Sequence, residues 1–380
     1  MNKKRDKKNI RQVNTALVLN TLFHNDSQMS RPDLAEEVGL SKVTIASIIR
    51  NLNQAGLTMD AGMGLPDHRG GRKPLLVALD KDSKRVISAR VGRDQIEMLL
   101  SDITGREVSR LRSAGGGATS PKEITAMVND LASKGGTKPE AVLGLMMTID
   151  QPEGRRLSDV DRQSYCSELS RLLNLRVSVV DLATARAFAQ RWYNDELEGP
   201  PDFFYLDLDA SLQAVTARKG ILGDSLPGFG SCCLSHLPYG SQNTTAATTE
   251  SLLSGEAFLE RAATIHGRRL SLSEIMGKVR AGDDYILELL QQYGYQLGCA
   301  LSLAVNLTSL HRVIIGGYMV EAWPFFSPLM SQGLSRHVHP EFKEKVAVSP
   351  LRKDLNDGLM GALAIALDEW IYQTSILPLD

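Results

Sequence analysis

Residues 30–52 read SRPDLAEEVGLSKVTIASIIRNL, and they predict two short helices joined by a tight turn. Ser30 is a favourable N-cap for the first helix, and Pro32 falls in its first turn, where a missing N–H has no helical partner to lose. Gly39 suits the left-handed position that commonly ends a helix. Ser41 is then placed to cap the second helix.

The second of these helices has an apolar back and a short polar front. The back carries Ile45, Ile48, Ile49 and Leu52, and the front carries Lys42, Thr44, Ser47 and Arg50. This arrangement is typical of a helix-turn-helix, whose second helix enters the major groove of DNA. We therefore expect the four polar side chains to contact DNA. The same spacing also fits a plain helical hairpin with a solvated polar face.

The flanking segments favour the DNA-binding interpretation. Apolar residues at helical spacing predict a further helix over 10–23. After Leu57, a Gly- and Met-containing stretch leads to the basic run DHRGGRKP at 67–74 and an apolar strand at 75–79, as in a wing hairpin. Arginines on extended backbone can enter a narrow minor groove. The residues expected there are Arg69, Arg72 and Lys73; the alternative is a flexible linker whose charges keep it solvated.

The charge distribution agrees with a head that meets nucleic acid. Residues 1–74 carry 12 Lys and Arg against 7 Asp and Glu, whereas the remainder carries 31 against 37. The four cysteines suggest no disulfide framework, so we expect a reducing, cytoplasmic compartment. The apolar segments are too short or too interrupted for a signal peptide or a membrane span.

Residues 81–380 predict two lobes, each of which opens with antiparallel strands and continues as α/β structure. The first lobe is expected over about 81–198 plus a C-terminal helix at 358–380, and the second over about 199–357. The expected strands are 86–91, 96–101, 107–112, 141–149, 176–180, 203–207, 212–217 and 312–315; the expected helices include 121–133, 164–173, 182–192 and 286–307. A duplicated fold of this kind offers a cleft for a small ligand.

Five segments in a fixed order carry a resemblance to a known family. They are Arg11-Gln12-Val13-Asn14, residues 30–52, Gly71-Arg72-Lys73-Pro74, Asn306-Leu307 and Ile314-Ile315-Gly316-Gly317. Their order is similar to that in the ROK family (repressors, open reading frames, kinases), in particular its transcriptional-repressor branch. The resemblance implies an α/β protein with a winged helix-turn-helix over 1–80. An actin-like (ribonuclease H-like) two-lobed sugar-kinase fold then follows over 81–380.

The kinase features that the resemblance implies are degenerate. The family's phosphate- and metal-handling Asp in the first strand corresponds to Arg90. Its glycine-rich phosphate hairpin corresponds to positions that hold Asp209, Ala210, Ser211, Gln213 and Val215. Side chains fill the space that bare backbone leaves for phosphate, and Asp209 would repel it. We therefore expect no catalytic residue and no cofactor.

The family's sugar site is partly retained. Asp181, His236 and Glu250 fall on sugar-contact positions of the family, so they are the candidate effector residues. Each also has a structural alternative: a helix N-cap for Asp181, a loop residue for His236 and a first-turn helix residue for Glu250. The family's zinc element falls on 241–250, where its three cysteines are absent, and we expect no metal.

These features together predict a DNA-binding transcriptional regulator, a repressor of carbohydrate-related genes that responds to a sugar or sugar derivative in a degenerate kinase cleft. The expected partners are a double-stranded DNA operator and further copies of the chain, in a homodimer or homotetramer. Two alternatives remain open. One is an active ROK sugar kinase with an accessory DNA-binding head, and the other is a regulator without a small-molecule effector.

Overall fold

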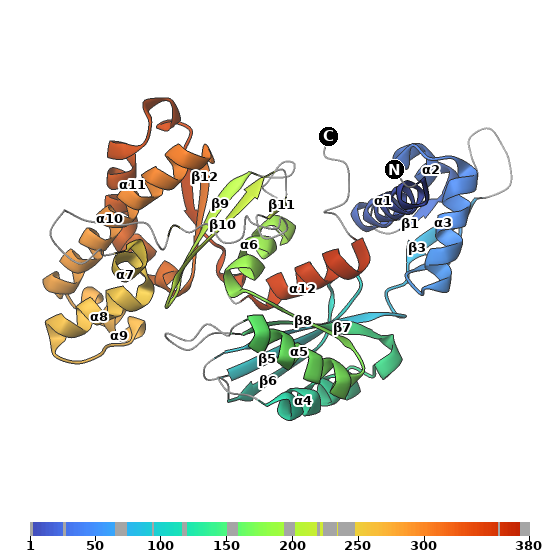
Figure 1. Ribbon diagram of the computed structural model, residues 1–380, viewed down its shortest axis with the longest axis horizontal. Helices are drawn as coiled ribbons and strands as arrows, with labels where there is room; N and C mark the ends of the chain where they lie inside the picture. Colours follow the sequence, from blue (N-terminus) through green and yellow to red (C-terminus); the bar gives the residue numbers. More distant parts are fainter. Residues whose placement is uncertain are drawn as a thin grey trace. The chain divides into compact units, whose positions relative to one another are not determined.

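The computed structural model describes 3–25, 28–64, 74–92, 95–115, 120–149, 159–193, 202–218, 221–222, 234, 248–355 and 358–372. The chain divides into two compact units (Figure 1). Unit 1 comprises Met1–Val180 and Ala362–Asp380, and unit 2 comprises Asp181–Gly361.

The N-terminal part of unit 1 is a winged helix-turn-helix, as predicted. Its elements are α1 (Lys3–His24), β1 (Gln28–Ser30), α2 (Arg31–Val38), α3 (Lys42–Gln54), β2 (Thr58–Met63) and β3 (Leu75–Leu79). The strands form an antiparallel sheet in the order β1-β3-β2. The predicted helix ends are confirmed: Ser30 Oγ accepts the N–H of Asp33, Ser41 Oγ accepts that of Thr44, and Gly39 has φ +70°.

The rest of unit 1 is a five-stranded sheet with helices on both faces. Its strands are β4 (Arg85–Val91), β5 (Gln95–Asp102), β6 (Glu107–Ala114), β7 (Val142–Ile149) and β8 (Arg176–Val180), in the order β6-β5-β4-β7-β8. The helices α4 (Pro121–Lys134) and α5 (Asp159–Leu173) pack Ile124 and Leu169 into a core with Ile87. The indole of Trp370 lies against Gly144 of β7, where a Cβ would be 2.8 Å from the ring.

Unit 2 repeats the same sheet order. Its strands are β9 (Phe203–Leu208), β10 (Leu212–Arg218), β11 (Ile221–Leu222), β12 (Arg312–Gly316) and β13 (Ala347–Pro350), in the order β11-β10-β9-β12-β13. In both sheets a hairpin is followed by parallel strands, so the predicted duplicated, two-lobed α/β fold is confirmed. The main helices are α6 (Leu182–Tyr193), α7 (Thr249–Leu253), α8 (Gly255–His266), α9 (Leu272–Arg280), α10 (Asp284–Thr308) and α11 (Trp323–His337).

The long helices α10 and α11 approach each other over glycine. A Cβ on Gly298 of α10 would be 2.0 Å from the carbonyl oxygen of Met330, and one on Gly333 of α11 would be 2.3 Å from that of Tyr295. Glycine is therefore required at these positions because the two backbones are too close for any side chain.

The compact units differ from the expected boundaries in two places. Helix α6, expected in the first lobe, groups with unit 2 because it packs against β9 and β10. The head, expected as a separate domain over 1–80, groups with the first lobe in unit 1. Helix α12 (Leu359–Leu367) and the π-helical turn Asp368–Tyr372 replace the single C-terminal helix that was expected.

Candidate nucleic-acid interface and effector residues

Helix α3 presents a narrow exposed face opposite its buried back. Ile45 and Ile49 are fully buried, whereas Lys42, Ser47 and Arg50 are exposed. Thr44 is half-buried, and its hydroxyl lies 2.9 Å from Ser41 Oγ. The structure thus places three of the four residues predicted on α3 at the surface, and it engages the fourth in the helix cap.

Strand β2 of the wing also exposes side chains. Met59 and Met63 of β2 are exposed, and Arg31 Nη2 of α2 lies 3.3 Å from Asp60 Oδ1, so an ion pair connects the first helix of the motif to the wing. The predicted minor-groove residues Arg69, Arg72 and Lys73 lie outside the described residues.

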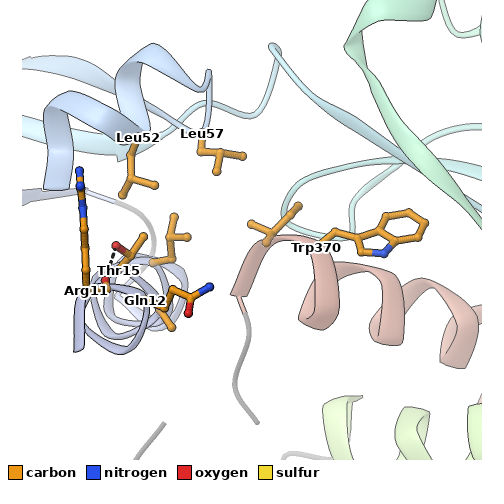
Figure 2. A pocket seen from close by; sticks show the side chains of 9 residues that line it. Arg11, Gln12, Thr15, Leu52, Leu57 and Trp370 are labelled. Atoms are coloured by element: carbon orange, nitrogen blue, oxygen red, sulfur yellow. Dashed lines mark hydrogen bonds between the residues drawn. The ribbon is translucent and has the colours of Figure 1, made fainter. Parts of the chain in front are cut away.

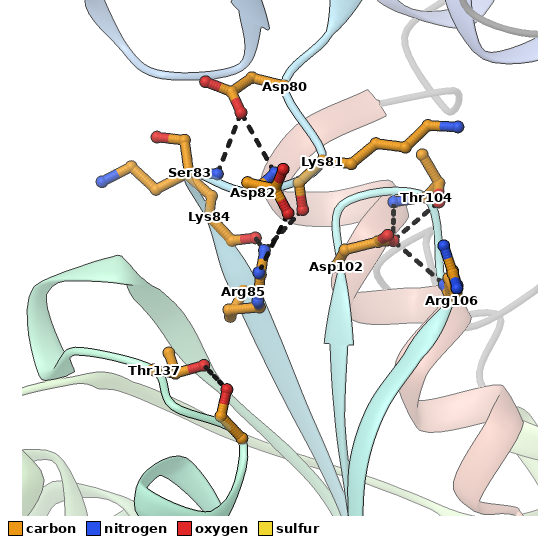
Figure 3. Close-up of polar contacts among 11 residues, drawn as sticks. Asp80, Lys81, Asp82, Ser83, Lys84, Arg85, Asp102, Thr104, Arg106 and Thr137 are labelled. Atoms are coloured by element: carbon orange, nitrogen blue, oxygen red, sulfur yellow. Dashed lines mark hydrogen bonds and ion pairs between the residues drawn. The ribbon is translucent and has the colours of Figure 1, made fainter.

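A structured turn joins the head to the first lobe (Figure 3). Asp80 Oδ1 accepts the backbone N–H of Ser83 at 3.1 Å, and Arg85 Nη1 donates to two carbonyl oxygens of the same turn. The N–H of Asp80 donates to the carbonyl of Leu57 at 3.0 Å. Gly56, with φ +69°, lies so close to Ser83 that a Cβ would meet its hydroxyl at 2.3 Å. The connection is therefore packed and hydrogen-bonded.

The C-terminal end of unit 1 holds α1. Asn20 Nδ2 donates to the carbonyl of Tyr372 at 2.9 Å, and the rings of Phe23 and Tyr372 lie 4.8 Å apart. The buried Tyr372 hydroxyl donates to the carbonyl of Ile103 at 2.7 Å, beside the β5–β6 turn. Side chains of α1, among them Arg11 and Gln12, line a pocket in unit 1 together with Leu52, Leu57 and Trp370 (Figure 2). Tyr372 thus binds both the DNA-binding head and the first lobe.

A buried ionic cluster occupies the start of the hairpin in unit 2. Arg186 Nη1 of α6 donates to both carboxylate oxygens of Asp207, at 2.9 and 2.8 Å, and to Asp209 Oδ2 at 2.6 Å. The hydroxyl of Tyr205 donates to Asp207 at 2.7 Å, and Asp209 Oδ1 accepts the N–H of Tyr318 at 2.8 Å. The side chains of Arg186 and Asp207 are each 4% exposed.

The cluster has one cation and two carboxylates, so it is one charge short of neutrality. Burial, together with the negative charge of Asp209, raises the pKa of Asp207 to about 6 against the pull of Arg186. The sequence identified Asp209 but missed Arg186 and Asp207. The sequence signal for them was Arg186, the single charged residue in the run LATARAFA, whose other residues are mostly small or apolar. A buried arginine in such a helix requires buried acidic partners.

The described candidate effector residues both lie at helix N-termini. Asp181 directly precedes α6, and its carbonyl accepts the N–H of Ala185 at 2.9 Å, so it stands at the N-cap position. Glu250 is half-buried in the first turn of α7, which Thr248 caps. His236 lies outside the described residues. These positions agree with the structural alternatives for Asp181 and Glu250 and leave their role toward a ligand as a prediction.

Two further features are absent from the described part of the chain. No group of three His, Cys, Asp or Glu side chains there could hold a metal ion. No described helix combines the length and the apolar character that crossing a membrane requires.

The fold and these sites define a class of protein: a winged helix-turn-helix attached to a sugar-kinase-like body. Comparison with known proteins agrees. The sequence model of the ROK family matches residues 244–369. The xylose repressor of Bacillus subtilis (strain 168) is 21% identical over 379 residues, which cover 95% of this chain and 97% of the relative. The xylose repressor of Caldicellulosiruptor bescii is 25% identical over 232 residues, 58% of this chain and 57% of the relative.

Solved structures show the same fold. A ROK family transcriptional regulator described as a homologue of the E. coli MLC protein superposes with a TM-score of 0.77 at 17% identity, covering 97% of this chain and 99% of that chain. The ROK hexokinase of Thermus thermophilus superposes with a TM-score of 0.58 at 19% identity, and the match covers 74% of this chain and 98% of that chain. The ROK family model thus matches the C-terminal part of the chain, and the matches that cover nearly all of it are to a protein named xylose repressor and to a ROK family transcriptional regulator.

Proposed function

We propose that the protein is a transcriptional repressor that binds operator DNA through α3 and responds to a sugar or sugar derivative. The observation that carries the proposal is the exposed face of α3, with its buried back and capped start, on a head fixed to a sugar-kinase-like body. The full-length similarity to proteins named xylose repressors supports the same conclusion.

In this proposal α3 enters the major groove, and the basic segment after the wing follows the minor groove. Lys42, Ser47 and Arg50 contact bases or phosphates, and the capped Thr44 contacts the DNA backbone near the helix start. Arg69, Arg72 and Lys73 supply the minor-groove contacts. A homodimer or homotetramer presents two heads to a pseudo-palindromic operator, with half-sites one or more helical turns apart.

A fluorescence-anisotropy titration on DNA from upstream of the protein's own gene tests the proposal. The wild-type protein should bind saturably, and its affinity should fall steeply between about 50 and 200 mM salt because phosphate contacts release counterions. Arg50→Ala should weaken binding and lower the salt slope. The matched control is Arg171→Ala, which removes an exposed arginine from α5 and should bind as the wild type does. Equal binding by both variants would contradict the proposed role of α3.

The proposed effector residues are Asp181, His236 and Glu250. Pentoses are the first sugars to test because the full-length relatives are named xylose repressors. A bound sugar should raise the melting temperature at millimolar concentration. Asp181→Asn keeps a favourable N-cap but removes the carboxylate, so it should lose the sugar-induced shift without loss of stability. No shift with any sugar or sugar phosphate would favour the alternative of a regulator without an effector.

We further propose that the body has no kinase activity. Arg90 stands where kinase members have their phosphate-handling Asp, and the carboxylates of Asp207 and Asp209 at the hairpin oppose a phosphate. ATP turnover with a panel of sugars should stay at the background rate. Sugar-dependent turnover would instead support a kinase with an accessory head.

A further inference from the structure

The exposed face of α3 contains one apolar residue that was not among the four polar residues predicted to contact DNA. Val43 is 80% exposed, the largest exposed fraction of any large apolar side chain among the described residues. It is the second residue of α3, directly after Lys42.

Helical geometry places Val43 at the centre of this face. At 3.6 residues per turn, Ser47 lies about 40° to one side of Val43 and Arg50 about 20° to the other. Lys42 and Thr44 lie about 100° away on either side, so they flank the face. The buried Ile45 is on the opposite side of the helix. Val43 therefore projects from the middle of the surface that the polar residues outline.

The chemistry of the major groove identifies what such a side chain would contact. Base edges there present hydrogen-bond donors and acceptors together with one apolar group, the C5-methyl of thymine. Side chains near the N-terminus of a recognition helix are the ones that reach base edges. A branched apolar side chain has no donor or acceptor to offer, so its complementary partner is the methyl group.

We infer that Val43 is a specificity-determining residue that recognises a thymine in each half-site through its 5-methyl group. This inference rests on the proposed function, because it assigns one contact within the proposed DNA interface. Removing either partner of one methyl contact should weaken binding about fourfold, equivalent to about 0.8 kcal/mol.

The test combines a protein change with a DNA change. The full-length protein first selects its binding site from a random library. Each thymine of one selected half-site is then replaced by deoxyuridine, which removes the methyl group and keeps the base pair. Affinities are measured for the wild type, Val43→Ala and the control Leu307→Ala, which trims an equally exposed side chain (78%) on α10.

The expected result is one thymine per half-site whose replacement weakens the wild type and the control about fourfold. Val43→Ala removes the contact in both half-sites at once, so it should bind the thymine site about sixteenfold more weakly than the wild type, yet respond no further to deoxyuridine at that position. At every other thymine the three proteins should respond equally. A repeated site selection with Val43→Ala should lose the thymine preference at that position alone.

The outcomes separate this inference from the proposed function. Saturable, sequence-selective binding in which Val43→Ala and the wild type respond alike to deoxyuridine at every position would overturn the role of Val43 and leave the repressor proposal intact. Absence of selective binding by the wild type would contradict the repressor proposal, and this inference with it.

Discussion

The buried cluster of Arg186, Asp207 and Asp209 allows a quantitative prediction for Arg186→Met. Methionine has a similar length and no charge, so the variant leaves two carboxylates without their cation. Breaking a buried ion pair in this way costs about 3–5 kcal/mol. The cost has an upper limit because a carboxylate can take up a proton. With an ordinary Asp pKa near 3.8, protonating Asp207 at pH 7 costs about 4 kcal/mol, at about 1.4 kcal/mol per pKa unit.

This limit makes the loss depend on pH in a defined direction. In the wild type the pKa of Asp207 is raised to about 6, so the folded state binds a proton that the unfolded state does not bind until the pH falls to about 4. Its stability therefore rises by about 1.4 kcal/mol from pH 7 to pH 5. In Arg186→Met the folded state keeps Asp207 protonated over this range, so the free energy of unfolding rises by about 2.7 kcal/mol from pH 7 to pH 5. The difference in this free energy between the two proteins therefore falls from about 4 to about 3 kcal/mol.

Hydrogen exchange of peptides that cover β9 and β10 measures this loss in the intact protein. It reports the opening free energy of this sheet and does not require the whole chain to unfold in one step. The control Arg280→Met makes the same chemical change at an exposed position of α9 and should cost less than about 1 kcal/mol. A loss for Arg186→Met no larger than the control, or one that grows as the pH falls, would refute the reasoning.

Three further substitutions test other parts of the structure. Gly298→Ala should lower the unfolding free energy by about 1–3 kcal/mol, because its Cβ would lie 2.0 Å from the Met330 carbonyl oxygen. Thermal melting checks this against the control Gly277→Ala, whose Cβ meets nothing within 4 Å and which should be as stable as the wild type or slightly more stable. Tyr372→Phe should leave the Ile103 carbonyl without its donor and cost about 1 kcal/mol, whereas Tyr285→Phe, exposed at 75%, should leave denaturant unfolding unchanged. Asn20→Ala should speed hydrogen exchange in α1, since its two buried bonds to carbonyls of Ala16 and Tyr372 are lost; unchanged exchange would show that these bonds do not hold α1.

The helix-turn-helix was predictable because its signals are local. The serine caps, the terminal glycine and the apolar spacing all act within a few residues, and each is present in the structure. Strand β1 was missed because three residues are too few to show alternation, and it exists through pairing with β3, whose Ala78 lies opposite Gln28. Local pattern therefore specified the helices of the head better than its sheet.

The candidate sites were predictable only in part, because they depend on contacts between distant residues. Arg186 meets Asp207 across 21 residues of sequence, and Asn20 meets Tyr372 across 352. Val43 was missed for a different reason. The polar front of α3 was assigned by residue type, whereas exposure depends on where the rest of the head leaves the helix uncovered.

Two covalent passages connect unit 2, which contains the candidate effector residues, with unit 1, which contains the head. The chain passes between its two compact units at Val180–Asp181 and at Gly361–Ala362. These passages are neighbours within unit 2, since a Cβ on Gly361 would be 1.8 Å from the carbonyl oxygen of Ala185, in the first turn of the helix that Asp181 precedes. From Gly361, α12 leads to Tyr372, which is hydrogen-bonded to Asn20 of α1. A ligand that alters the backbone at Asp181 therefore acts one helix away from a residue bound to the DNA-binding head, and it can shift the head only by its differential affinity for the two arrangements.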